Sequence, residues 1–174
     1  MVPIEIVFTK SKKKFPIGSW LIRWWTKQPY SHVAKRLPRR DWGHGYYQAK
    51  DGKVNYEHED VFHTHHIIVK EYKIKVEAEL ELAIRKSCWK ETGKKYALMQ
   101  NLGIFLVDVL KIIWIKINNP WKDGRNCSEL LYVNVFKQMI PGLQFDENKI
   151  KPHEIEQIVL EHFIEQDGFW YIRG

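Results

Sequence analysis

The sequence has little cysteine, and this scarcity excludes one class of small stable domain. Two cysteines, Cys88 and Cys127, occur in 174 residues, so the chain is not a disulfide-stapled scaffold of the secreted type. The N-terminal apolar run "VPIEIVF" is too short for the apolar core of a secretory signal, and its lysines follow the run instead of preceding it. We therefore expect a reducing, cytoplasmic setting, with packaging in a phage-like particle as an alternative destination.

The sequence also lacks a long apolar run and any low-complexity segment. Its most apolar stretch, 102–117, is interrupted by Asp108, Lys111 and Lys116 and is shorter than the roughly 20 residues of a spanning helix. We interpret it as a buried amphipathic helix, with peripheral membrane contact as the alternative. Eight Trp, eight Tyr and eight Phe residues argue against disorder. The length and the absence of a linker predict one domain over 1–174.

The charge balance is positive, at +7, and basic clusters such as "KSKKK" and "KRLPRR" lie in the N-terminal part. Such clusters can meet phosphates or an anionic membrane, although charged runs more often form a solvated face. Many aromatic residues beside basic ones also suit a single-stranded nucleic acid. No RNP-like or zinc-finger motif supports that interpretation, so we expect no nucleic-acid partner. The sequence does not determine an oligomeric state.

Hydrophobic periodicity places strands mainly in the first half of the chain and helices mainly in the second. Strands are expected at 4–10, 31–37, 42–50, 54–57, 66–76 and 168–173, with an Asp-Gly hairpin turn before 54–57. Helices are expected at 18–28, 77–92, 96–115, 127–139 and 151–161. This segregation predicts an α+β domain instead of alternating βαβ units.

Cys127 occupies the first turn of one expected helix. Asn126 is a good N-cap residue, and Glu129, three positions later, completes a capping-box pattern. A thiol at a helix N-terminus feels the positive end of the helix dipole, and free N–H groups there can hold an oxyanion. This setting suits a nucleophile, while a buried structural cysteine is the alternative. Cys88, which follows Ile84 at helical spacing, is expected in the core.

A nucleophilic cysteine needs a base, and eight histidines are available. His32 and His44 lie on short expected strands beside polar residues. A second group, in "EHEDVFHTHH", holds His63 and His65, which would share one face of a strand. No cysteine or second spaced His pair completes a metal site around them. We therefore expect this group to serve the surface or packing, and we expect no metal or organic cofactor.

Five short stretches of the sequence resemble one enzyme family in their order. They are "WLIRWWTKQPYSHVAKRL", "YYQAKDGKV", "GKKYALMQNLGIF", "NCSELLYVNVF" and "KPHEIEQ". Together they resemble the circularly permuted, papain-like NlpC-type cysteine hydrolases, in the YiiX-like branch. The resemblance spans roughly Trp20 to Gln157. It implies a permuted papain-like α+β fold, in which a small antiparallel sheet or barrel packs on a helical half that carries the nucleophile.

The resemblance also implies roles for individual residues. Cys127 takes the place of the nucleophile and His32 that of the base. Gln48 takes the third, polar place, where an acidic residue is common in the family; a neutral amide can orient the imidazole but stabilises its charged form less. His44 is the rival third residue, because His44 and Gln48 share one face of a strand.

The resemblance leaves the substrate open. Tyr30, His44 and Ser128 are expected to border it, with ordinary aromatic packing as the alternative for Tyr30. The relatives act on peptide or amide bonds, and related permuted proteins act on lipid acyl groups. We therefore expect a cysteine peptidase or amidase, with a lipid acyl hydrolase or acyltransferase as the second candidate. A non-enzymatic basic and aromatic module that binds nucleic acid or membrane is the competing class.

Overall fold

The computed structural model of this chain describes residues 1–13, 17–39, 43–50, 52–95, 126–146 and 150–173. It is a mixed α+β structure, as the segregated pattern of strands and helices predicts. The expected helix at 96–115, and with it the apolar stretch 102–117, lies outside the described residues.

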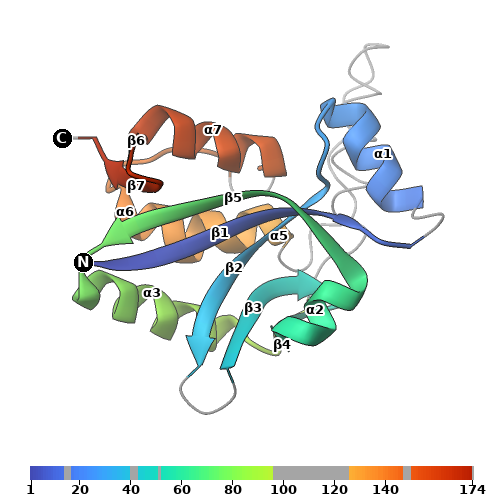
Figure 1. Ribbon diagram of the computed structural model, residues 1–174, viewed down its shortest axis with the longest axis horizontal. Coiled ribbons are helices and arrows are strands. Elements are labelled where there is room, and N and C mark those ends of the chain that lie inside the picture. Colours follow the sequence, from blue (N-terminus) through green and yellow to red (C-terminus); the bar gives the residue numbers. More distant parts are fainter. Residues whose placement is uncertain (14–16, 40–42, 51, 96–125, 147–149, 174) are drawn as a thin grey trace.

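A seven-stranded sheet forms the centre of the fold (Figure 1), in the order β4-β3-β2-β1-β5-β7-β6. The strands are β1 (Val2–Ser11), β2 (His32–Arg39), β3 (Gly43–Lys50), β4 (Lys53–His58), β5 (His66–Val76), β6 (Phe163–Gln166) and β7 (Phe169–Ile172). Neighbouring strands are antiparallel, apart from the parallel pair β5 and β7. The order has two ends, so the described strands form an open sheet and not a barrel.

Helices cover the sheet unevenly, because alternate strand residues point to two different clusters. The helical elements are α1 (Ile17–Thr26), α2 (Glu59–His65), α3 (Ala78–Glu91), α5 (Cys127–Leu131), the π-helical turn η1 (Tyr132–Phe136), α6 (Lys137–Met139) and α7 (Pro152–His162). On β1, Ile6 and Phe8 belong to the main core with residues of α3, α5 and α7. Val7 points the other way, into a smaller cluster with Phe62 of α2. Most helices therefore lie on one face, and α2 lies on the other (Figure 1).

Two elements differ from the expectation. No helix was expected in the histidine-rich stretch, where only a strand would place His63 and His65 on one face, but the stretch forms helix α2. The side chain of His58 accepts from the Asp60 amide, and Glu59 and Asp60 occupy the first turn, a favourable start for a helix. Strand β6 was not expected either; it pairs with β7 across an Asp-Gly turn whose two residues have φ of 51° and 75°.

A continuous helical segment, Cys127–Met139, carries the cysteine at its first residue and packs on the sheet. Its middle turn is π-helical. The Asn134 amide there donates to the Leu130 carbonyl at 2.9 Å, and Ser87 of α3 donates to the Asn134 amide oxygen at 2.6 Å. The second bond ties the segment to α3. The sheet therefore contacts the start of the segment, and α3 holds its middle turn.

Candidate active site

The local cap around Cys127 matches the sequence-based expectation. The Asn126 side-chain oxygen accepts from the Glu129 amide at 2.8 Å, and Cys127 is the first residue of α5. Helix α5 packs on β2 and β3, and only 1% of Cys127 is exposed. A helix start, which is usually solvated, is therefore pressed against the sheet at the place where β2 begins.

His32 is the first residue of β2 and meets Cys127 there. The two side chains are hydrogen-bonded. On the other side of the ring, His32 Nε2 lies 2.8 Å from Gln48 Oε1. Because an amide oxygen only accepts, Nε2 carries the proton in this bond, and Nδ1 is left to face the sulfur. Cys127, His32 and Gln48 thus form one hydrogen-bonded row, although they come from three separate elements.

The electrostatics of the row favour a charged pair. Burial alone would raise the pKa of Cys127, but the charge and hydrogen bond of His32 lower it, with further help from the Val33 amide and the Ser128 hydroxyl. Burial alone would lower the pKa of His32, but Cys127 raises it, and the hydrogen bond to Gln48 adds to this effect. Each partner thus favours the charged form of the other, which is a thiolate beside an imidazolium.

The row continues beyond Gln48 to a carboxylate. The Gln48 amide donates to Glu57 Oε2 at 2.8 Å, and Lys50 donates to Glu57 Oε1 at 2.9 Å. Sequence reasoning missed Glu57. The hairpin register contained a signal, because Gln48 pairs with Asn55 and Glu57 lies two residues further along the same face of β4. An acidic group is therefore present one hydrogen bond behind the neutral third residue.

A second histidine backs the ring of His32. His66, at the start of β5, stacks on His32 with ring centroids 5.2 Å apart and planes 26° apart. Phe62 stacks on the other side of His66 at 4.6 Å, and Tyr46 stacks on Phe62 at 3.8 Å. His66 Nδ1 lies 3.2 Å from the Thr9 hydroxyl. Burial lowers the pKa of His66 to about 2, and the neighbouring His32 charge adds to this shift. His66 is therefore neutral, and it serves packing, as was expected of its histidine group.

Two other expected site residues lie in different settings. Ser128 is next to the thiol, with its hydroxyl 4.0 Å from the Cys127 sulfur. Tyr30 does not line an entrance; it is fully buried, its hydroxyl donates to Glu156, and its ring lies 4.8 Å from that of Phe8. The packing alternative for Tyr30 therefore describes its position, because a buried carboxylate needs the hydroxyl as a donor.

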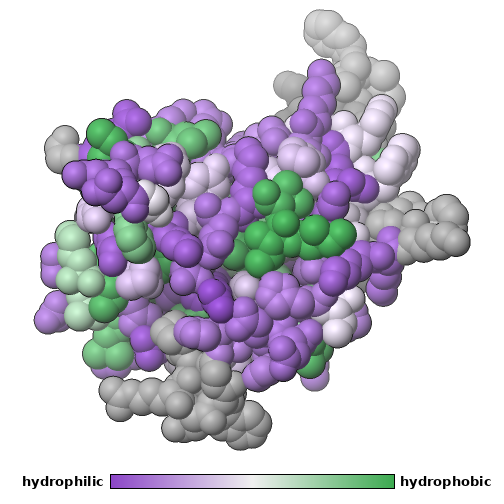
Figure 2. Space-filling view, in the orientation of Figure 1, coloured by the Kyte–Doolittle hydropathy of each residue, from purple (hydrophilic) through white to green (hydrophobic). Residues whose placement is uncertain are grey.

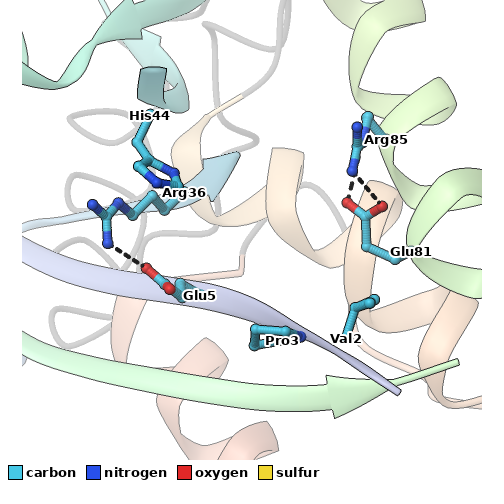
Figure 3. Close-up of a pocket in the computed structure, with 7 residues that line it drawn as sticks. All are labelled: Val2, Pro3, Glu5, Arg36, His44, Glu81 and Arg85. Carbon is cyan, nitrogen blue, oxygen red and sulfur yellow. Dashed lines mark hydrogen bonds and ion pairs between the residues drawn. The ribbon is translucent and has the colours of Figure 1, made fainter. Parts of the chain in front are cut away.

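His44 lies at the other end of β3, away from the row. It pairs with Pro38, six residues along β2 from His32, a span of roughly 20 Å at about 3.3 Å per residue. It lines a separate cavity of about 270 Å³ (Figure 3). Both arginines of that cavity are paired. Arg36 lies 2.8 Å from Glu5, and Arg85 lies 2.7 Å from Glu81. Of the two candidates for the third place, the structure brings Gln48 to His32 and leaves His44 apart.

Comparison with known proteins gives one likeness of fold. No protein family model and no curated protein matches this chain. Among solved structures, the chain is similar to the metalloprotein YiiX from Escherichia coli O157:H7, with a TM-score of 0.52 and 17% sequence identity. The alignment covers 82% of this chain and 67% of that protein. Across the described residues, no group of three or more His, Cys, Asp or Glu side chains is placed to hold a metal. The likeness therefore shows a YiiX-like α+β fold.

Proposed function

We propose that this protein is a cysteine hydrolase of the permuted papain-like, NlpC type, acting through an acyl thioester on Cys127. The observation that carries the proposal is the hydrogen-bonded row from Cys127 through His32 to Gln48. A nucleophile, a base that contacts it and a third group that orients the base are the parts that such a reaction needs. The YiiX-like fold agrees with this proposal but supplies no activity.

In the acylation step, the Cys127 thiolate attacks the carbonyl carbon of the substrate. A carbon–sulfur bond forms, and the carbonyl electron pair moves to the oxygen, which backbone N–H groups at the start of α5 stabilise. The tetrahedral intermediate then collapses and its bond to the leaving group breaks. The amine or alcohol leaves with the proton that His32 Nδ1 has held since the thiol ionised. Gln48 holds the ring so that this nitrogen faces the sulfur.

In the deacylation step, water attacks the thioester carbon. Neutral His32 takes the proton from the water, a carbon–oxygen bond forms, and the carbon–sulfur bond breaks to regenerate the thiolate. The product is a carboxylic acid, and His32 is again an imidazolium beside the thiolate. An alcohol or amine in place of water would make the same protein an acyltransferase.

A peptide or amide is the first candidate substrate, and an acyl lipid is the second. The second is favoured by helix α1, whose Trp20 and Trp24 are 55% and 63% exposed. This helix touches the segment that carries the base, since the Ser19 and Ser31 hydroxyls lie 2.6 Å apart and Ser31 precedes His32. Apart from this surface, the two candidates do not differ, because an acyl lipid and a peptide would react through the same thioester.

Trapping the acyl-enzyme tests the proposal. Incubation with activated acyl esters, such as p-nitrophenyl acetate and p-nitrophenyl octanoate, should add one acyl group to Cys127, located by peptide mass mapping. The adduct should be absent from Cys127→Ala and retained in Cys88→Ala, the matched control at the other cysteine. A wild-type protein that takes no acyl group, or takes it equally at Cys88, would leave the non-enzymatic binding module as the better description.

A further inference from the structure

Helix α1 presents two large aromatic side chains to solvent. Trp20 and Trp24 lie one helical turn apart, with their rings stacked at 6.3 Å and 14°. They are 55% and 63% exposed. Trp25 faces elsewhere, because the Lys151 ammonium at the start of α7 lies 4.5 Å from its ring. One side of α1 thus meets the rest of the protein, while the tryptophan pair points outward. Adjacent exposed large aromatics of this kind mark an interaction surface.

The sequence on either side of this pair is strongly basic. The stretch from Ile6 to Arg40 contains ten of the 28 Lys and Arg residues and none of the 21 Asp and Glu residues. The remainder of the chain therefore has more acidic than basic residues, so the positive excess of the whole protein belongs to the stretch that holds α1. Lys13 precedes the helix and Lys27 follows it, and both are exposed. Figure 2 shows pale, near-neutral atoms over α1 beside purple hydrophilic ones.

We propose that α1, with Lys13 and Lys27 on either side, docks this protein on the surface of an anionic phospholipid bilayer. Tryptophan prefers the level of the headgroups, where its ring is in apolar surroundings and its N–H stays hydrated. Basic residues are attracted to the negative surface potential. A helix of ten residues is too short to span and lies in the plane of the interface. None of the helices in the described residues is long and apolar enough to cross a bilayer.

An anionic membrane fits this surface better than a single-stranded nucleic acid does. Bases bind by stacking on free aromatic faces, and the mutual stacking of Trp20 and Trp24 occupies one face of each ring. Both side chains are more than half exposed, and an indole with an apolar ring and a polar N–H suits the headgroup level of a bilayer. The docking does not depend on the reactivity of Cys127. It would, however, bring the Ser31–His32 segment close to the bilayer, through the contact between Ser19 and Ser31.

Vesicle flotation with the full chain tests the docking. Wild-type protein should float with vesicles of phosphatidylcholine mixed equally with phosphatidylglycerol, and not with vesicles of phosphatidylcholine alone. The double variant Trp20→Ala/Trp24→Ala should lose most of this binding. Trp89→Ala, which removes a 43% exposed tryptophan from α3, is the matched control and should bind like wild type. Circular dichroism should show that each variant is folded.

The charges are tested in the same assay. Lys13→Gln and Lys27→Gln should each lower the vesicle partition coefficient by about fivefold at low salt. Added salt should reduce the difference between each variant and wild type. The exposed Lys86 and Lys90 of α3 supply the matched control as Gln variants, with little expected change. Cys127→Ala should float like wild type, so failure of the proposed chemistry and failure of docking are distinguishable.

Three outcomes would overturn the docking proposal. The first is a wild-type protein that does not bind the phosphatidylglycerol vesicles, and the second is a folded tryptophan double variant that binds them as well as wild type. The third is binding to a single-stranded oligonucleotide, weakened by the same variants, with no binding to vesicles. In that case the surface serves nucleic acid.

Discussion

The two cysteines of this protein are equally buried and differ in chemistry. Cys88 lies in α3 with 0% exposure, and Cys127 begins α5 with 1% exposure. Burial raises the pKa of Cys88 to about 11, and the charge of the nearby Lys35 offsets this only in part. The pKa of Cys127 is instead lowered, because His32, the Val33 amide and the Ser128 hydroxyl outweigh its burial.

The comparison teaches that burial does not decide which thiol ionises: the charge of His32, followed by hydrogen-bond donors, lowers the pKa of Cys127, and Cys88 has no comparable set of favourable partners. Lys35 is itself buried, and burial lowers its pKa; the charge of Glu81, which lies 3.8 Å from the Lys35 ammonium, raises the pKa of Cys88 in turn. His32 is held by Gln48, which favours its charged form. A buried thiol becomes a nucleophile where the surrounding structure has already supplied donors for the thiolate.

The largest expected effect is loss of turnover on removing either member of the charged pair. Cys127→Ala removes the nucleophile and should abolish acyl transfer. His32→Ala should lower kcat/KM by about 10²–10⁴-fold, the usual contribution of a general base. Cys88→Ala should keep full activity and lose on the order of 1 kcal/mol of stability, because the alanine leaves only a small cavity. Steady-state rates on an activated ester, beside thermal melts, measure both quantities. An active His32→Ala variant would transfer the role of base to another histidine.

Alkylation should separate the two thiols next. At pH 7 a thiol whose pKa is about 11 is ionised in only about one molecule in 10⁴. Iodoacetamide should therefore modify Cys127 on the order of 10²-fold or more faster than Cys88, since access is similar and thiolate content is not. Time-resolved peptide mass mapping of the folded protein gives the two rates. Equal rates would mean that the Cys127 thiol is not activated.

Substitution of Gln48 should have a milder effect. Gln48→Ala leaves the ring free to turn and should lower the rate by about 10²-fold or less. Gln48→Glu places a carboxylate beside the His32 ring, which should raise the pKa of His32. The basic limb of the pH–rate profile should then move to higher pH. The new carboxylate also lies beside Glu57, whose Oε2 is 2.8 Å from the Gln48 amide. These two like charges should raise the pKa of one carboxyl, which limits the rise in the pKa of His32.

His44→Ala is the control for Gln48, since both residues lie on β3 and only Gln48 contacts His32. A pH–rate series on the three variants distinguishes them. If His44→Ala lost most of the activity and Gln48→Ala kept the wild-type rate, His44 would be the third residue instead of Gln48.

His66→Phe should have the smallest effect on rate and a clear effect on acid stability. A phenyl ring can keep the stack between His32 and Phe62, so activity should change only a few-fold. In wild type the pKa of His66 is about 2 in the folded state against 6.5 ordinarily, so the unfolded state binds more protons between these values. Wild-type stability should therefore fall as the pH drops below about 6.5. The variant has no imidazole at position 66, so its stability should fall less over the same pH interval.

Thermal melts at pH 7 and about pH 5 measure the difference, because proton uptake by the unfolded chain spans this interval. The charges of His32, Lys50, His65 and His63 add to the lowering of the His66 pKa. The exposed His65 is therefore the matched control as His65→Phe, which should keep the wild-type fall in Tm. Identical slopes in wild type and His66→Phe would show that His66 is protonated in the folded state.

Local sequence was sufficient for most of the described elements. The alternation in β1 and the Asp-Gly turn between β3 and β4 are properties of a few neighbouring residues. Helix α2 was missed because its seven residues hold too few periodic positions, although its acidic first turn was a usable signal. For Tyr30 the sequence left a site entrance and core packing open, because an aromatic residue beside a candidate base suits both equally well. Its partner Glu156 comes from the distant helix α7.

The sequence by itself determined the cap at Asn126, the helical position of Cys127 and the core position of Cys88, because these depend on residues within about one helical turn. Only the tertiary structure decided what Cys127 meets. His32 and His66 come near each other because β2 and β5 both pair with the same end of β1, at Thr9 and Ser11. Strand order depends on long-range pairing, which periodicity leaves open. The same thiol is a core residue or a nucleophile according to the strand on which its helix packs.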